Sequence, residues 1–109
     1  MTRRDKCVIN FTVDGAFDQL IPIGQILFDS GMIRKVRSVC PEKEHMFIAH
    51  GNRLPLGRWP RMWSSIQQNT PLPAVSLEKN GPFYCLIDGR HRTVASLCYG
   101  YTHVPAIIK

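Results

Sequence analysis

The sequence has no apolar run that approaches 18 residues, so no segment is expected to cross a membrane. Residues 1–6, MTRRDK, are charged and are expected to fray; no apolar core of a signal peptide follows them. Internal repeats and low-complexity tracts are absent, and a hydrophobic content of 44% excludes a polar disordered chain. With 109 residues, the chain is expected to form a single domain with its own core.

Cysteine is scarce, and no two cysteines stand at Cys-x-x-Cys spacing, so a zinc ribbon or redox dithiol is not expected. Cys7, Cys85 and Cys98 fall in apolar segments, where a free thiol packs as a small hydrophobe. The sequence also lacks a Walker loop and a Gly-x-Ser-x-Gly motif. No metal site is predicted, because three histidines show no metal-ligand spacing: His45, His50 and His103. Together these features predict an intracellular, reducing, cytoplasmic location.

Negative charge is in short supply. The chain has 14 Lys and Arg against 8 Asp and Glu, a net charge of +6 and a pI of about 9.5. This balance favours anionic partners such as nucleic acid, nucleotides or phosphorylated ligands. The alternative is that the positive charge only aids solubility.

In the first half of the chain, alternating β-branched residues predict a strand over Cys7–Val13. An apolar run over Leu20–Leu27 is interrupted by proline and glycine, which predicts a short edge strand leading into a turn. Met32–Val39 alternates weakly, which leaves strand and loop open. Pro41 opens a predicted helix over Glu42–Ala49, because proline suits the first turn and acidic residues suit the positive helix N-terminus.

In the second half, a helix is predicted over Pro60–Gln68, ending before an asparagine and a proline. Two strands follow, over Ala74–Lys79 and Phe83–Ile87, and the Asn-Gly pair at positions 80–81 joins them as a hairpin. Phe83–Ile87 is mostly apolar, so we expect it to be central. A helix over Arg90–Tyr99 carries one apolar stripe, and Gly100 is placed to cap it.

A final strand is predicted over Val104–Ile108, at a sheet edge because Pro105 cannot donate to a ladder. The order of strands, helices, hairpin, helix and strand predicts an α+β domain with a small mixed sheet and flanking helices.

The segment Leu86–Val94, LIDGRHRTV, combines a buried strand, a tight turn and a helix start. The first turn of a helix has unpaired N–H groups and the positive end of the macrodipole. Glycine at the turn lets a ligand approach the backbone closely. The segment therefore predicts a phosphate or nucleotide site with these residues: Gly89, Arg90, His91, Arg92 and Thr93.

Asp88 has two interpretations. It could cap the helix by accepting from backbone amides, which is the role we favour. Alternatively, it could orient His91, hold a metal on a nucleotide phosphate or act as a base, with Asp88 and His91 as catalytic candidates. The alternative for residues 88–92 as a whole is that they form only a helix N-terminal cap followed by arginines in solvent, with no binding site.

Basic and aromatic residues are mixed within positions 52–63, NRLPLGRWPRMW. Such a segment could grip a nucleic-acid strand, or it could close as a lid over a ligand at the glycine turn. The alternative is that the tryptophans pack on the core while the arginines extend into solvent. The candidate residues are Arg53, Arg58, Trp59, Arg61 and Trp63.

Residues 86–108, LIDGRHRTVASLCYGYTHVPAII, resemble the signature of the ParB/sulfiredoxin superfamily: strand, (D)G-x-[HR]-R, helix, glycine, loop and a V-P-[AV] strand. Upstream, residues 20–26 (LIPIGQI) resemble its opening element, and residues 63–77 (WSSIQQNTPLPAVSL) resemble its helix followed by a proline-led strand. The resemblance covers most of residues 20–108. It implies a stand-alone, single-domain member with the fold of the ParB N-terminal domain.

The resemblance implies a nucleotide or phosphate at the glycine turn, with Gly89 at the turn, Arg92 as a phosphate contact and His91 as a second donor. Asp88 matches the kinase-like branch, whose additional upstream acid has no clear counterpart; Asp29 and Glu42 are the candidates. Position 90 holds arginine where sulfiredoxins have their reactive cysteine, so the reductase nucleophile is missing. Partitioning proteins carry a further arginine on the helix, where this chain has valine at position 94. They also have separate DNA-binding and dimerisation domains, for which this sequence leaves no residues.

Three functions follow as hypotheses. The first is a small regulator that binds phosphate groups of nucleic acid or of a nucleotide, with ATP, ADP or CTP and Mg²⁺ as the candidate ligand. The second is a nucleotide-dependent phosphotransferase or a nuclease-like enzyme that uses Asp88 and His91. The third is an interaction protein of a phage or mobile element that acts on a host protein. The sequence leaves the oligomeric state open.

Overall fold

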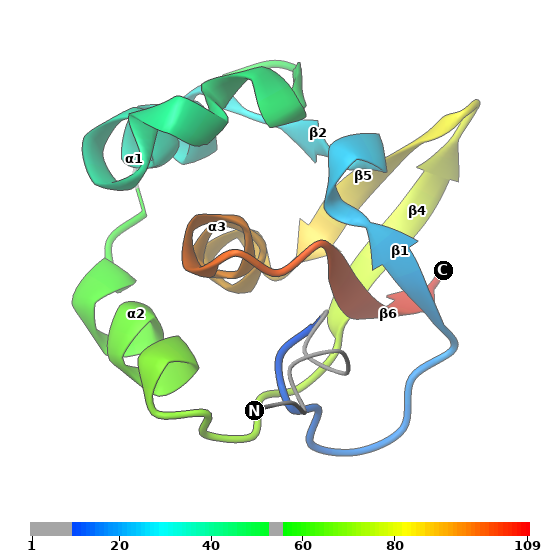
Figure 1. The fold of residues 1–109 in the computed structure, drawn as a ribbon. Helices are drawn as coiled ribbons and strands as arrows, with labels where there is room; N and C mark the ends of the chain where they lie inside the picture. Colours follow the sequence, from blue (N-terminus) through cyan, green and yellow to red (C-terminus); the bar gives the residue numbers. More distant parts are fainter. Residues whose placement is uncertain (1–9, 53–55) are drawn as a thin grey trace.

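The computed structural model describes residues 10–52 and 56–109, and these residues form a mixed α+β structure (Figure 1). The main sheet has four strands in the order β1-β6-β4-β5. Their bounds are β1 Gln19–Pro22, β4 Val75–Asn80, β5 Phe83–Asp88 and β6 His103–Ile108. β6 runs antiparallel to β1 and parallel to β4, and β4 runs antiparallel to β5. The predicted α+β class with a small mixed sheet and flanking helices is therefore confirmed.

Helices lie against the main sheet, and two very short strands pair with each other beside it. Figure 1 shows α3 between the sheet and the other two α-helices. Because α3 is enclosed from several directions, every residue from Arg92 to Leu97 is buried. The remaining elements are α1 Ser30–Val39, α2 Trp59–Gln67, α3 Arg90–Tyr99, the 3₁₀ helices η2 Ile23–Gln25 and η3 Pro41–Met46, and the strands β2 Leu27–Phe28 and β3 Ile48–Ala49.

Several predicted elements are confirmed. α2 and α3 match the predicted helices, and β4 and β5 form the hairpin expected at positions 80–81, where Gly81 has a positive φ of 61°. Gly100 follows α3 in the left-handed conformation with φ 106°, as expected for a C-terminal cap. The short edge strand expected within Leu20–Leu27 is β1, which is followed by η2.

The strand or loop expected over Met32–Val39 is wrong, because these residues belong to helix α1. The side chain of Asp29 caps α1 by accepting a hydrogen bond of 3.0 Å from the backbone N–H of Met32. Met32 and Val36, four positions apart, are buried on one face. The predicted helix over Glu42–Ala49 is also wrong in part, since η3 ends at Met46 and strand β3 follows.

The strand predicted over Cys7–Val13 is not observed in its described part. Residues 7–9, like the residues 1–6 expected to fray, lie outside the described residues. Residues 10–18 form no regular element, and one isolated bridge joins Val13 to Leu72.

The positions of two strands in the sheet also differ from expectation. β5 is an edge strand rather than a central one; its Tyr84 is buried and forms an isolated bridge to Ile26. β6 is an inner strand although it contains Pro105. Pro105 pairs with Leu20 of β1, and pairing with β4 begins one residue later, at Ala106. The missing N–H therefore removes no bond from the β4 ladder.

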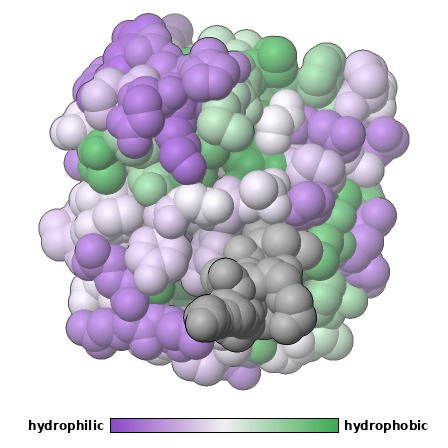
Figure 2. All heavy atoms as spheres, viewed as in Figure 1, coloured by the Kyte–Doolittle hydropathy of each residue, from purple (hydrophilic) through white to green (hydrophobic). Residues whose placement is uncertain are grey.

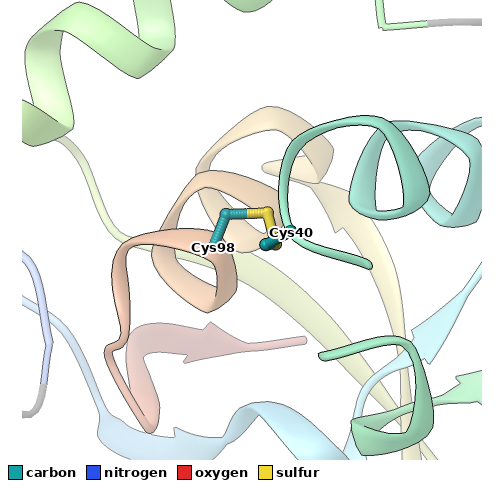
Figure 3. The surroundings of a disulfide bond; sticks show 2 residues. All are labelled: Cys40 and Cys98. Carbon is teal, nitrogen blue, oxygen red and sulfur yellow. A yellow bond between two sulfur atoms is a disulfide. The ribbon is translucent and has the colours of Figure 1, made fainter. Parts of the chain in front are cut away.

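A disulfide between Cys40 and Cys98 joins the end of α1 to the last turn of α3 (Figure 3). The two Cα atoms are 5.6 Å apart and the cysteines are separated by 58 positions in the sequence. The expectation of a free thiol at Cys98 is therefore wrong, while Cys85 is a free, half-buried cysteine. Cys7 lies outside the described residues.

None of the helices that the structure describes has the length and apolar character needed to cross a membrane.

Candidate functional site

A cavity of about 670 Å³ lies where β5 ends and where α2 and α3 begin. One part of its wall is apolar, and the rest is dominated by cationic and polar groups. Both helix N-termini carry partial positive charge and backbone N–H groups that have no partner within the helix. The lining residues are Arg58, Arg61, Met62, Ser65, Leu72, Pro73, Ile87, Asp88, Gly89, Arg90, His91 and Arg92.

Gly89 is the residue that turns the chain from β5 into α3. It occupies the N-cap position with a φ of 115°, in the left-handed region, and no side chain caps the helix. A Cβ atom at this position would lie 2.5 Å from Cγ1 of Val75, so the close approach of β4 also requires glycine. The expectation that Asp88 caps the helix is therefore wrong, because Gly89 holds the cap position.

Thr93 is fully buried and does not line the cavity. Its backbone N–H and its hydroxyl both donate to the carbonyl oxygen of Gly89, each at 2.9 Å. The hydroxyl therefore stabilises the first turn of α3 from inside. Of the five residues predicted for the phosphate site, Thr93 is the one that the structure places away from the cavity.

Arg90 directs its guanidinium group toward α1. Its Nε and Nη2 donate to the two carboxylate oxygens of Asp29 at 2.7 and 2.8 Å. Both side chains are nearly buried, with 13% of Arg90 and 7% of Asp29 exposed. Burial raises the pKa of Asp29, but the hydrogen bonds from Arg90 and from the Met32 amide outweigh it and lower the pKa overall. Arg90 thus ties the start of α3 to the cap of α1.

Arg92 points in another direction, toward the segment that leads into β4. Its Nη1 donates to the carbonyl oxygen of Pro73 at 2.8 Å and approaches that of Ala74 at 3.4 Å. Its Nη2 donates to Asp88 at 3.1 Å. The sequence predicts that Arg90 and Arg92 converge on one anion, but each guanidinium is held by acceptors of the protein itself.

His91 connects the beginnings of two helices. Its Nε2 accepts a hydrogen bond of 3.1 Å from the backbone N–H of Arg58, the N-cap residue of α2. The accepting nitrogen carries no proton, so this bond assigns a neutral ring with its proton on Nδ1. Burial lowers the pKa of His91, and so do the positive charges of Arg90, Arg58, Arg92 and Lys35.

Arg58 and Arg61 present cationic side chains to the cavity from α2. With Met62 and Ser65 they occupy one helix face, at spacings of three, four and seven residues. Both arginines are exposed, and neither forms an ion pair within the part of the chain that the structure describes. They are therefore better placed than Arg90 or Arg92 to meet an anionic ligand.

The tryptophans of the predicted basic-aromatic segment lie on a different face of α2 and do not line the cavity. Trp59 is buried, stacks on Trp63 at a centroid distance of 5.4 Å and has Nζ of Lys35 5.5 Å above its ring. Trp63 packs edge-on against Tyr99 of α3 at 6.2 Å. This geometry fits the alternative in which the tryptophans pack on the core. Arg53 lies outside the described residues.

Asp88 is the acidic residue of the cavity wall. Its side chain is 76% exposed and accepts the hydrogen bond from Arg92. A carboxylate in this position could accept a proton or contribute one ligand to a cation on a bound phosphate. Among the described residues, no group of three or more His, Cys, Asp or Glu side chains could hold a metal ion on its own.

The candidates for the upstream acid have separate positions. Asp29 is used by Arg90 and by the cap of α1, whereas Glu42 is exposed on η3. Sequence reasoning missed the bond between His91 and Arg58, because nothing local to either residue indicates it.

Comparisons of the chain with protein families, with curated proteins and with solved structures found no match.

Proposed function

We propose that this protein is a small regulator of the ParB/sulfiredoxin type that binds the phosphate group of a nucleotide or of nucleic acid in the cavity beside Gly89. The observation that carries the proposal is that two helix N-termini meet at one cavity with Arg58 and Arg61, which form no ion pair with any residue that the structure describes. Backbone amides, helix dipoles and guanidinium groups together favour phosphate.

The arrangement of β5, Gly89, α3, Gly100 and β6 supports the proposed family, since the resemblance expects a strand, a glycine turn, a helix, a glycine and a strand in this order. Support for an organic phosphate comes from the mixed wall of the cavity. Met62, Leu72, Pro73 and Ile87 offer apolar surface for the rest of such a ligand. These considerations favour ATP, ADP or CTP, with Mg²⁺, over a bare phosphate ion.

The surface charge also supports an anionic partner. Figure 2 shows hydrophilic side chains gathered over the part of the molecule where Figure 1 draws α1. The exposed residues of this helix include Arg34 and also Arg37, which forms an ion pair with Glu44 of η3. A polyanion such as a nucleic-acid strand would meet these charges as well as those of the cavity, and its binding would weaken steeply with salt.

A phosphotransferase or nuclease-like activity is the second candidate, because the carboxylate of Asp88 is on the cavity wall and mostly exposed. His91 is less suited to act as the base in this structure, since its Nε2 already accepts from Arg58. Phosphate release separates the two functions: an enzyme of this kind releases phosphate and loses this activity in Asp88→Asn, whereas a regulator binds the nucleotide and releases no phosphate.

The test of the proposed function is a titration of ATP, ADP, CTP and single-stranded DNA, with and without Mg²⁺, followed by calorimetry or thermal shift. Arg61→Gln is expected to weaken binding about tenfold or more, because it removes a charge-assisted contact. Arg34→Gln is the matched control for the nucleotide titrations, because this exposed arginine on α1 does not line the cavity.

If none of these ligands binds, or if Arg34→Gln weakens nucleotide binding as much as Arg61→Gln does, the proposal is wrong. A stable complex with a host protein in place of ligand binding would favour the third hypothesis, an interaction protein.

The cytoplasmic location stays a prediction. The redox state of Cys40 and Cys98 in the isolated protein tests it, because a disulfide is rare in the reducing cytosol.

A further inference from the structure

We propose that anion binding in the cavity is coupled to protonation of His91, so that the site binds a phosphate or sulfate group more tightly at acidic pH. This inference rests on the proposed function, since it requires that the cavity accept an anion. It adds a regulatory property: the proton acts as a second ligand of the same site.

The first argument is the hydrogen bond between His91 and Arg58. In the structure, Nε2 of His91 accepts from the backbone N–H of Arg58 at 3.1 Å, so both groups are occupied by each other. An imidazolium ring has two donors and no acceptor. Protonation therefore breaks this bond and releases two donors, the Nε2–H group of His91 and the amide of Arg58. Both residues line the cavity, where an anion can accept from them.

The second argument is the charge around His91. Lys35 faces it from α1, Arg58 from α2, and Arg90 and Arg92 from α3, while Arg61 lines the same cavity. The acidic groups nearby are engaged: Asp29 accepts from Arg90, and Asp88 accepts from Arg92. In the protein without an anion, burial and the surrounding cations keep the pKa of His91 low.

A doubly charged anion in the cavity reverses this balance. It attracts the imidazolium form and offsets the repulsion from the four cations that face His91, so the pKa of His91 rises in the complex. Linkage is reciprocal: if the anion favours the proton, the proton favours the anion by the same factor. Each unit by which the pKa is higher in the complex increases the anion affinity about tenfold at low pH.

Sulfate is the best probe, because it stays doubly ionised between pH 5 and pH 8, whereas phosphate itself titrates in this range. We expect calorimetric titrations to show sulfate binding about fivefold or more tighter at pH 5 than at pH 8. In His91→Gln the amide oxygen can still accept from Arg58, but the side chain cannot become charged, so the affinity should not depend on pH. His45→Gln, an exposed histidine on η3 outside the cavity, should behave as the unaltered protein.

A second measurement does not depend on a variant. The imidazole signals of His91 in NMR spectra should titrate at higher pH with saturating sulfate than without it. Equal sulfate affinity at pH 5 and pH 8, or an unchanged His91 titration, would overturn the coupling while leaving the anion site in place. Absence of sulfate and nucleotide binding at every pH would overturn the proposed function as well.

Discussion

Asp29 and Arg90 are 61 positions apart in the sequence, and the carboxylate of the first accepts two hydrogen bonds, of 2.7 and 2.8 Å, from the guanidinium group of the second. The pair joins the N-cap of α1 to the first residue of α3. At the opposite ends of the same two helices, Cys40 and Cys98 form the disulfide. α1 is therefore fixed to α3 at both ends, which holds the first turn of α3 in place beside the cavity.

The Asp29–Arg90 pair should contribute more to stability than an exposed pair. Asp29→Asn keeps a side chain that can cap α1 but removes the negative charge that Asp29 places against the nearly buried guanidinium group of Arg90, so we expect a loss of about 3 kcal/mol in the free energy of unfolding. Asp29→Ala also removes the cap and should cost about 1 kcal/mol more. Urea denaturation of the three proteins measures both differences.

Glu44→Gln provides the matched control, because it breaks the exposed pair between Arg37 and Glu44, whose N–O distance is also 2.7 Å. Its cost should stay below about 1 kcal/mol, as is usual for exposed ion pairs. If Asp29→Asn destabilises the protein no more than Glu44→Gln, then the burial of the Asp29–Arg90 pair has no energetic consequence and this interpretation fails.

Gly89 should tolerate no side chain. Gly89→Ala combines an unfavourable φ of 115° with a Cβ that would lie 2.5 Å from Val75, and we expect a loss of about 3 kcal/mol. Gly15 has a similar φ of 103° but no atom within 4 Å of its ideal Cβ, so Gly15→Ala should cost only about 1 kcal/mol. Thermal denaturation compares the two variants, and equal costs would show that the contact with Val75 is unimportant.

Local signals in the sequence were sufficient for part of the fold. Helix α3 has its predicted bounds, because a glycine stands at each end. The single apolar stripe predicted for it does not describe its burial, since every residue from Arg92 to Leu97 is buried. Helix α1 is not predicted, because its start depends on the cap by Asp29 and because Arg34, Lys35 and Arg37 make the apolar positions look like weak alternation. The sheet position of β6 depends on register with β1 and β4, which local patterns do not contain.

The candidate site was predictable in its backbone and less so in its side chains. Gly89 and His91 line the cavity as a glycine turn and helix start would suggest. The directions of Arg90 and Arg92 depend on acceptors that come from distant segments, at Asp29 and Pro73. The basic-aromatic segment divides over two faces of α2, with arginines on the cavity and tryptophans toward the core, which follows only once the helix is known.

The disulfide should stabilise the folded protein by about 4 kcal/mol, since it closes a loop with a sequence separation of 58 in the unfolded chain. We expect reductant to lower the midpoint of thermal unfolding, and Cys98→Ser to lower it by the same amount without further response to reductant. Cys85→Ser is the control, because Cys85 is free, and it should keep the full response. If alkylation of the denatured, unreduced protein modifies all four cysteines, the disulfide is absent from the isolated protein.

The stability of the protein should fall as the pH is lowered through the ordinary pKa of histidine, and His91 should contribute to this dependence. Burial and the cations around His91 make its pKa in the folded protein lower than its value of about 6.5 in the unfolded chain. The unfolded chain therefore binds the proton first, so the contribution of His91 is complete above pH 6.5 and decreases between this value and the lower folded pKa. The decrease cannot exceed about 1.4 kcal/mol per pH unit, the limit for one proton.

Urea denaturation between pH 5 and pH 8, without anions that bind, should show a smaller dependence of the unfolding free energy on pH for His91→Gln than for the unaltered protein. Equal slopes would mean that neither the bond to Arg58 nor the neighbouring cations affect the ionisation of His91.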